Sequence, residues 1–384
     1  MRRREWLQVM AGVALSGVPR VWAAPRRVVI VGSGILGASI AYHLVRRGAD
    51  VTVVEKHDIA TGATANSFAW LNANYSKRPR PYFELNRLGL MAYRHLDAEL
   101  DGGLAVQWGG SVEWHDDAKR AAALKDNVAF HQVWGYGTRL IEAAELNTLE
   151  PKVRPGPVVT AAYCDQEGHV DPVNAVRVLV ARARKLGARV LTQTEVKGIE
   201  RTAGRISGVT TSQGSLPAET VVVACGVDTG RVAALAGVTV PLKDSPGLIA
   251  HTTPLPRLLG RVVLAPGAHM KQTADGRILT ADGFGGSPTT DQSKAMGLKL
   301  LSNARRFLPD LPDAFDRVTL GWRPLPKDDR PIVGYAPQAP GLYVTVMHSG
   351  MTMAPIIGRL AASEILDGID VDLLSTFRLS RFGL

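Results

Sequence analysis

A glycine-rich turn between two apolar segments constrains the fold of this chain more than any other feature. The run Arg27–Val31 is rich in β-branched residues, as in a buried parallel strand, and Gly32-Ser33-Gly34-Ile35-Leu36-Gly37 follows it directly. Residues 38–47 then place apolar side chains on one helical face. Asp50–Val54 has the pattern of a second strand, and Glu55 stands at its end. This order predicts a strand–turn–helix–strand unit.

The spacing of the three glycines indicates that this turn binds a dinucleotide. Gly32 allows a tight turn, Gly34 lets a pyrophosphate approach the backbone, and Gly37 lets the helix lie close to the sheet. N–H groups at the start of the helix then bind phosphate oxygens. Glu55 lies 23 residues after Gly32, where a carboxylate accepts hydrogen bonds from ribose hydroxyls. An acid at this position argues against the 2′-phosphate of NADP.

The rest of the chain argues against a simple NAD-dependent dehydrogenase, which would complete its nucleotide fold in one run. The segment after Glu55, IATGATANSFAWLNANY, is small and polar and does not continue the strand–helix alternation. A helix over residues 172–185, a strand over residues 189–193 and the buried strand in ETVVVACGVDT come much later. The nucleotide domain is therefore predicted to be discontinuous, with segments 25–75, 150–235 and 315–384.

The remaining residues predict a second part that is interwoven with the first. These are residues 76–149 and 236–314. LAVQWGGSVEWHDD is expected to form two strands turned by Gly109-Gly110, and GAHMKQTADGRILTADGF to form a hairpin turned at Asp275-Gly276. Helices are expected near residues 82–100, 117–135 and 291–307.

The order of these motifs resembles the FAD-dependent oxidoreductases built like D-amino-acid oxidase, which include glycine and sarcosine oxidases and D-amino-acid dehydrogenases. The resemblance covers nearly all of residues 26–370. It rests on the fingerprint through Glu55-Lys56, and on GHVDP (168–172), VVACG (222–226), GWRPLPKDDRPIVG (321–334) and GMTMAPIIGRLAASEILDG (350–368). It implies an α/β fold, in which a Rossmann-like FAD-binding domain is interwoven with an α+β substrate domain containing an antiparallel sheet.

The resemblance also implies which residues hold FAD. The expected contacts are Gly32, Ser33, Gly34, Ile35, Leu36 and Gly37 around the pyrophosphate, Glu55 and Lys56 at the adenosine, Thr64, Ala65 and Asn66 on the flavin side, Val196 at the adenine, Gly226 after the VVAC strand, and Gly350, Met351 and Thr352 at the flavin pyrimidine. Backbone N–H groups at a helix start there would stabilise negative charge on the reduced flavin. Because no cysteine lies near residues 350–352, the flavin is expected to be non-covalent.

Arg323, in Gly321-Trp322-Arg323-Pro324, is the candidate substrate-binding residue. In the amino-acid oxidases, the arginine of the matching motif pairs with the substrate carboxylate, and the guanidinium fork suits two carboxylate oxygens in one plane. The alternative is a structural arginine that pairs with Asp328 or Asp329. His348 is the second catalytic candidate, for contact with flavin or substrate. Its dipeptide Met347-His348 departs from the family's Gly-His pattern, which leaves an exposed loop role open.

The expected reaction is the oxidation of a C–N bond in a small amino acid or secondary amine, with oxygen or a respiratory acceptor receiving the electrons. Two alternatives remain at this point: an FAD enzyme acting on a non-amine such as a hydroxy acid, and a flavin-binding subunit of a heteromeric dehydrogenase. A homo-oligomer is also open. The histidines at positions 169, 251, 269 and 348 lack metal-ligand spacing, so no metal site is expected.

The N-terminus resembles a twin-arginine export signal. RREWLQ (Arg3–Gln8) precedes a short apolar stretch and a small-residue cleavage site at Val21-Trp22-Ala23, which predicts a signal peptide over residues 1–24 and a periplasmic location. A disordered basic tail or a membrane anchor is the alternative. The net charge of +10 falls to +7 without residues 1–23, and no basic block with interleaved aromatics follows, so nucleic-acid binding is not expected.

Overall fold

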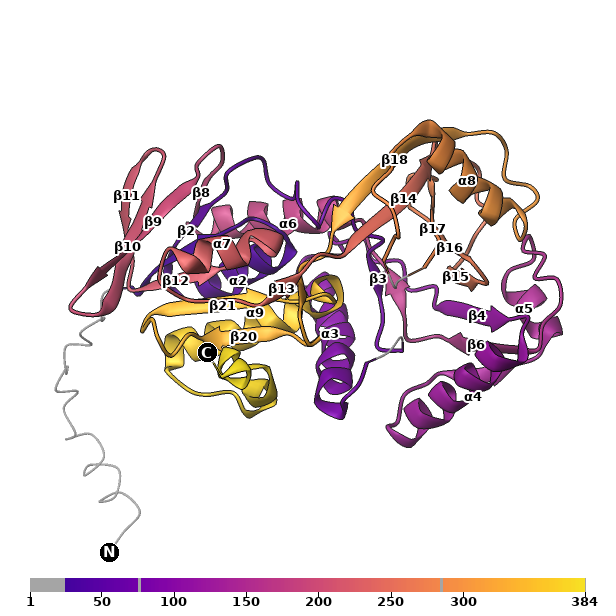
Figure 1. Cartoon of the computed structure of the whole chain (residues 1–384), viewed down its shortest axis with the longest axis horizontal. Helices are drawn as coiled ribbons and strands as arrows, with labels where there is room; N and C mark the ends of the chain where they lie inside the picture. Colours follow the sequence, from indigo (N-terminus) through magenta and orange to yellow (C-terminus); the bar gives the residue numbers. More distant parts are fainter. Residues whose placement is uncertain (1–24, 75–76, 284–285, 384) are drawn as a thin grey trace, which may run out of the picture.

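The computed structural model describes residues 25–74, 77–283 and 286–383, which form two parts built on two large sheets (Figure 1). The predicted signal peptide lies outside the described residues. None of the helices within the described ranges is long and apolar enough to cross a membrane.

A six-stranded sheet forms the first part. In spatial order its strands are β20 (Ile332–Tyr335), β21 (Leu342–Val346), β12 (Thr220–Val223), β1 (Arg27–Val31), β2 (Asp50–Val54) and β8 (Arg189–Leu191). β1 pairs in parallel with both β2 and β12, and Val31 is level with Val54 and with Val223. The residues that follow these three strands therefore meet at one edge of the sheet.

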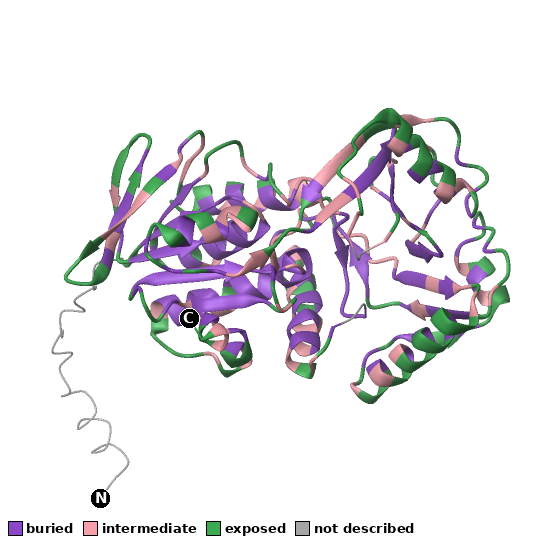
Figure 2. Ribbon diagram, viewed as in Figure 1, coloured by how far each residue is buried: buried purple, intermediate pink, exposed green. Residues whose placement is uncertain are grey.

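Both faces of this sheet are covered, which explains why its central strands are mainly apolar (Figure 2). Val28 and Ile30 face a core shared with helices α2 (Ile35–Arg46), α6 (Pro172–Lys185) and α9 (Gly350–Asp367). Val29 and Val31 face the opposite core, formed with α7 (Thr229–Ala234) and a three-stranded sheet. That sheet consists of β9 (Val196–Thr202), β10 (Arg205–Thr211) and β11 (Gly214–Pro217).

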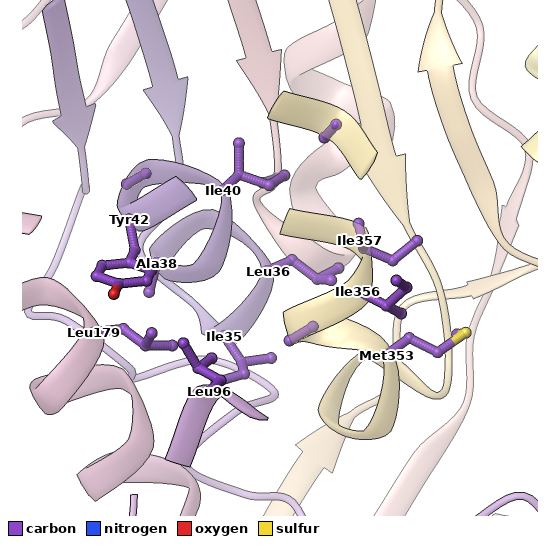
Figure 3. Close-up of a cluster of buried hydrophobic side chains, with 14 of the residues drawn as sticks. Ile35, Leu36, Ala38, Ile40, Tyr42, Leu96, Leu179, Met353, Ile356 and Ile357 are labelled. Atoms are coloured by element: carbon purple, nitrogen blue, oxygen red, sulfur yellow. The ribbon is translucent and has the colours of Figure 1, made fainter. Parts of the chain in front are cut away.

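Helices α2 and α9 pack directly on each other. Figure 3 shows Leu36 of α2 beside Ile356 and Ile357 of α9. Ser39 Oγ of α2 donates a hydrogen bond of 2.7 Å to the carbonyl of Ala354 in α9. A Cβ on Gly358 would lie 2.3 Å from that Oγ, so the small residue sets the distance between the helices. Helix α2 begins at Ile35, earlier than the predicted residue 38, and α9 begins at Gly350, so both glycine motifs lie at the first turns of their helices.

An eight-stranded sheet forms the second part and is mainly antiparallel. Its order is β18 (Phe315–Trp322), β14 (Pro246–Thr252), β17 (Ile278–Ala281), β16 (Ala268–Gln272), β15 (Val262–Ala265), β4 (Ser111–His115), β6 (Thr160–Cys164) and β5 (Arg139–Ile141). Helices α4 (Ala118–Val133), α5 (Ala143–Leu149) and α8 (Lys294–Arg305) accompany it. The expected helices and the β16–β17 hairpin are present.

Shorter elements complete the chain. Helix α3 (Arg80–Glu99) crosses α9 so closely that a Cβ on Gly89 would lie 2.4 Å from the carbonyl of Thr352. The remaining elements are β3 (Trp70–Leu71) paired with β7 (Gly168–His169), β13 (Leu242–Lys243) paired with β19 (Leu325–Pro326), and 3₁₀ helices at Gly226–Asp228, Asp372–Phe377 and Leu379–Phe382.

The predicted hairpin at Gly109-Gly110 is wrong. β4 begins only at Ser111 and pairs with β6 and β15, while Gln107 forms an isolated bridge with His169. The two glycines serve close packing instead. A Cβ on Gly109 would lie 2.3 Å from the carbonyl of Gly260, and Gly110 has a φ of +85°. Glycine is favoured both in tight turns and where two backbone segments pack closely, so a Gly-Gly pair alone does not show which of the two roles it has.

The sheets also divide the chain differently from the predicted boundaries at two strands. β18 and β6 belong to the eight-stranded sheet, although the sequence places residues 315–384 and 150–235 in the nucleotide domain. β18 is a long strand that reaches from the second part to the first, which is why a boundary at residue 315 divides the sheets poorly (Figure 1).

Replacing Gly37 with alanine tests the close contact between α2 and the turn before it. The new Cβ would lie 2.0 Å from the carbonyl oxygen of Gly32, and this backbone atom has no rotamer into which it can move. We expect Gly37→Ala to lower the free energy of unfolding by about 1–3 kcal/mol, measured by denaturant titration. Gly198→Ala in β9 is the matched control, because its Cβ would have only ordinary contacts at 3.6 and 3.7 Å. Equal stability of the two variants would contradict the packing argument.

Candidate active site

A cavity of about 510 Å³ lies where the two parts meet, and residues from both parts line it. One end is formed by the edge of the six-stranded sheet, with Gly34, Glu55 and Val196. The other end is formed by the ends of β14 and β18, with Arg323, and by the start of α9. The cavity therefore brings together nearly all the motifs, although they are widely separated in the sequence.

The glycine turn between β1 and α2 forms part of the cavity wall. Gly32 has a φ of +102°, and a Cβ there would lie 2.7 Å from the carbonyl oxygen of Ala224, so only glycine fits. Gly34, Ile35 and Leu36 line the cavity. No residue in the described part of the chain accepts a hydrogen bond from the N–H groups of Gly34 and Leu36. They are therefore available to phosphate oxygens.

Glu55 is held in place by the turn itself. The backbone N–H and the hydroxyl of Ser33 donate to its Oε2 at 2.9 and 3.0 Å, and the N–H of His57 donates to its Oε1 at 3.0 Å. Ser33, a predicted cofactor contact, is fully buried and does not line the cavity, and its observed role is to position the carboxylate. A carboxylate oxygen can accept more than one hydrogen bond, which leaves capacity for ribose hydroxyls.

Ion pairs border this nucleotide end of the cavity. Lys56 Nζ lies 2.6 Å from Asp228 Oδ2, and Arg231 lies 3.5 Å from Glu195. All four residues line the cavity, as do the predicted contacts Val196 and Gly226. Lys56 is thus engaged by a side chain of the protein.

The segment after β2 links the turn to the second part. Thr64 Oγ1 accepts a hydrogen bond of 3.1 Å from the N–H of Ile35. Thr64 and Asn66 line the cavity, whereas Ala65 and, in the turn, Gly37 do not. A Cβ on Gly321 would lie 2.7 Å from the carbonyl of Asn66, so the GWRP motif lies against this segment. Of the three predicted flavin-side residues, the cavity lining thus contains Thr64 and Asn66.

The start of α9 closes the other side. Gly350, Met351 and Thr352, the residues expected at the flavin pyrimidine, all line the cavity. Thr352 Oγ1 accepts from the N–H of Asn72 at 3.2 Å, which ties the helix start to the segment after β3. Within the described residues, nothing accepts from the N–H groups of Gly350 and Met351. Two helix N-termini, those of α2 and α9, therefore present backbone donors to one cavity.

Arg323 lies at the cavity wall beyond the end of β18. Its Nε donates to the carbonyl of Ser245 at 3.2 Å and its Nη2 to the carbonyl of Pro246 at 3.3 Å, which orients the guanidinium plane. The alternative pairing with Asp328 or Asp329 is wrong. Asp328 accepts from Arg381 at 2.8 Å, and Asp329 accepts from Lys243 at 2.9 Å.

His348 lies in the cavity wall and is partly buried, which argues against a fully exposed loop role. Burial lowers the pKa of its imidazole to about 3, and the positive charges of Lys77 and Arg323 act in the same direction. The imidazole is therefore neutral at physiological pH, with one nitrogen that donates and one that accepts.

Lys77 is a cavity residue that the sequence analysis missed. Its side chain is only 5% exposed, and its Nζ donates to Ser349 Oγ at 2.7 Å. Burial lowers the pKa of the ammonium to about 8, against a smaller opposing effect of Glu167. Lysine is rarely buried, so its position in SKRP carries no local signal of a site. The one available hint was its closeness to the flavin-side segment ending at Tyr75.

Comparison with known proteins identifies the family. A family model described as FAD dependent oxidoreductase (DAO) matches residues 27–364. Glycine oxidase of Bacillus licheniformis is 26% identical, over 92% of this chain and 96% of its own length. One of the opine oxidase subunits of Agrobacterium tumefaciens (strain Ach5) is 29% identical with the same coverage. The crystal structure of glycine oxidase from Geobacillus kaustophilus matches with a TM-score of 0.84 at 25% identity, over 93% of this chain and 99% of that one.

This chain belongs to the FAD-dependent oxidoreductase (DAO) family.

Family membership confirms the predicted fold and the prediction of FAD, and the cavity fits that cofactor. Backbone donors at Gly34 and Leu36 suit the diphosphate, and Glu55 suits the ribose. Donors at the start of α9 suit the electron-rich pyrimidine end of a flavin. Cys164 and Cys225 are both free thiols. Over the described ranges, no group of three or more His, Cys, Asp or Glu residues is arranged to hold a metal ion.

The buried ammonium of Lys77 gives a stability prediction for the FAD-loaded protein without substrate. The folded-state pKa is about 8 against 10.5 for an ordinary lysine, so the unfolded chain binds more protons between these values. The resulting penalty is complete below about pH 8 and diminishes as the pH rises towards 10.5. This penalty corresponds to about 3 kcal/mol of lost stability. A variant without the ammonium regains it but loses the hydrogen bond to Ser349, which costs about 1 kcal/mol.

We therefore expect Lys77→Met to be more stable than the wild type at pH 7, by about 2 kcal/mol. The difference should narrow steadily in unfolding measurements from pH 8 to pH 10. Lys125→Met, on the exposed face of α4, is the control and should show no such trend. If the stability difference between Lys77→Met and the wild type did not change with pH, the pKa of Lys77 would not be lowered in the folded protein.

Proposed function

We propose that this chain is an FAD-dependent oxidoreductase that oxidises the C–N bond of a small amino acid or secondary amine. The observation that carries the proposal is the placement of Arg323, whose oriented guanidinium shares one cavity with the flavin-side residues Thr64 and Thr352. A planar fork of donors suits a carboxylate better than any other common group on a small metabolite. The matched relatives include glycine oxidase, which supports the same substrate class.

The residues of the chain act by binding and orientation. Arg323 holds the substrate carboxylate, and so fixes the neighbouring carbon relative to the start of α9. Neutral His348 is placed to accept a hydrogen bond from the substrate nitrogen, and the adjacent positive charges of Lys77 and Arg323 favour an uncharged amine. Bound FAD supplies the acceptor for the hydride from the carbon attached to nitrogen. The released imine then hydrolyses in water.

The electron acceptor and the location are parts of the same proposal. Oxygen or a respiratory acceptor receives the electrons. The sequence RREWLQ near the N-terminus supports export of the folded protein to the periplasm by the twin-arginine route. In a host with this route, Arg3→Lys/Arg4→Lys should keep the protein in the cytoplasmic fraction while the wild type is exported. Equal export of both would remove this part of the proposal.

Arg323 tests the reaction directly. We expect anaerobic titration with one or more of glycine, D-amino acids or N-methyl amino acids to bleach the flavin absorbance. Arg323→Lys should then raise the substrate concentration needed for half-reduction by about 10- to 100-fold, because lysine cannot form the two parallel bonds of the guanidinium. Arg317→Ala, an exposed arginine on the same strand β18, is the control and should behave as the wild type.

The same titration separates the competing functions. A flavin that hydroxy acids bleach and amines do not would favour the non-amine alternative. A flavin that no compound reduces would favour a second candidate, one component of a heteromeric enzyme. This candidate is supported by the 29% identity to the Agrobacterium opine oxidase chain, which is named as one subunit of an oxidase. Reduction that requires a co-purified second chain would establish it.

A further inference from the structure

The cavity holds a second cation that the proposed reaction does not require. The ammonium of Lys77 has three donors, and within the described residues its one hydrogen-bond acceptor is Ser349 Oγ at 2.7 Å. The hydroxyl of Tyr82 lies 2.8 Å from the same Oγ, so this oxygen is fixed from two sides. The two other donors of the ammonium remain available at the cavity wall.

Among the described residues that line the cavity, no carboxylate lies at this end. The acids that line the cavity within that part of the chain are Glu55, Glu195 and Asp228, and all three lie at the nucleotide end. Glu195 and Asp228 are also engaged there by Arg231 and Lys56. The opposite end carries Lys77 and Arg323, with neutral His348 within reach of the charge of both.

Glu167 is the acid whose charge acts on Lys77, but its carboxylate accepts hydrogen bonds from other groups of the protein. It is fully buried, and it accepts hydrogen bonds from Ser111 Oγ at 2.7 Å and Tyr136 Oη at 2.8 Å, and from the N–H groups of Ala73 and Asn74. Within the described part of the chain, no ion pair joins it to Lys77. An ammonium buried without a paired anion is costly, which points to an anion supplied by a ligand.

We propose that Lys77, together with Ser349 and Tyr82, forms a second anion subsite, and that the substrate is an amino acid or secondary amine with two carboxylates. One carboxylate binds Arg323 and the other binds Lys77. This inference rests on the proposed function for the identity of the first carboxylate site. The two cations at one end of the cavity then select for dianionic substrates, and a monocarboxylate leaves the buried ammonium of Lys77 unpaired.

A binding experiment that needs no turnover tests the second subsite. Straight-chain dicarboxylates from malonate to adipate are titrated into FAD-loaded protein, each against the monocarboxylate of equal carbon number, with calorimetry or the flavin spectrum as the readout. We expect at least one dicarboxylate to bind about 10- to 100-fold more tightly than its monocarboxylate partner. The best chain length indicates the spacing of the two cations.

Variants at Lys77 assign the preference to this residue. In Lys77→Met the ratio of dicarboxylate to monocarboxylate affinity should fall to near one, while Lys77→Arg should retain most of it because the positive charge remains. Lys125→Met should keep the wild-type ratio. FAD content of each variant is measured first, and the wild-type ratio together with Lys77→Arg still decides the question if Lys77→Met fails to retain flavin.

Three results would overturn the inference. The first is a wild-type protein without preference for any dicarboxylate. The second is an unchanged ratio in Lys77→Met. The third is an equal loss of affinity for both ligands in Lys77→Met, which would assign the ammonium to the flavin or to the carboxylate at Arg323.

The outcomes also separate this inference from the proposed function. If dicarboxylate binding depends on Lys77 but no amine reduces the flavin, the second subsite stands and amine oxidation is rejected. Flavin reduction by monocarboxylic amines without any dicarboxylate advantage would do the opposite.

Discussion

The structure depends on how closely α2 approaches the turn that precedes it. The carbonyl of Gly32 occupies the place where any residue larger than glycine at position 37 would put its Cβ, only 2.0 Å away. This contact holds the helix start at the edge of the six-stranded sheet, beside the ends of β2 and β12. The other face of α2 packs on α9 through Ser39 and Gly358, so the second helix start is brought to the same cavity. One tight backbone contact thus positions both sets of N–H donors that the cofactor needs.

The two parts of the molecule have separate tasks that meet at the cavity. The six-stranded sheet supplies the nucleotide end, where protein acids and bases pair with each other. The ends of β14 and β18, the start of α9 and the segment before α3 supply the other end, which carries Arg323 and Lys77. The acid that acts on Lys77, Glu167, is bound by four donors of the protein. The cations that border the nucleotide end are thus paired with protein acids, whereas the ammonium of Lys77 has no ion-pair partner among the described residues, which favours a small anionic ligand.

The parts of the fold that follow from short-range pattern were predictable. Strand β1, the glycine turn, β2 and Glu55 follow one another closely in the sequence, and their spacing is enough to predict the strand–turn–helix–strand unit. Arg323 was identified through its motif, since a family resemblance carries long-range information that periodicity lacks. Lys77 was not predictable, because its burial results from α3 and α9 closing around it, and no local pattern marks a lysine as internal. The prediction at Gly109-Gly110 was wrong for a related reason, as the partners that require glycine there, Gly260 and Cys164, are distant in sequence.

The pairing of β14 with β18 has a consequence for how such proteins vary during evolution. Seven residue pairs join these strands, from Pro246 with Trp322 to Thr252 with Phe315, and Arg323 follows directly after Trp322 on the cavity side. Side chains alternate between the faces of a sheet, so the gain or loss of one residue within β18 would turn the residues near its end to the opposite face. Substitutions along the strand preserve the direction of Arg323, whereas insertions and deletions do not. A change of length in β18 near Arg323 would therefore alter the site unless a register irregularity absorbed it, like the one already present between His251 and Thr252.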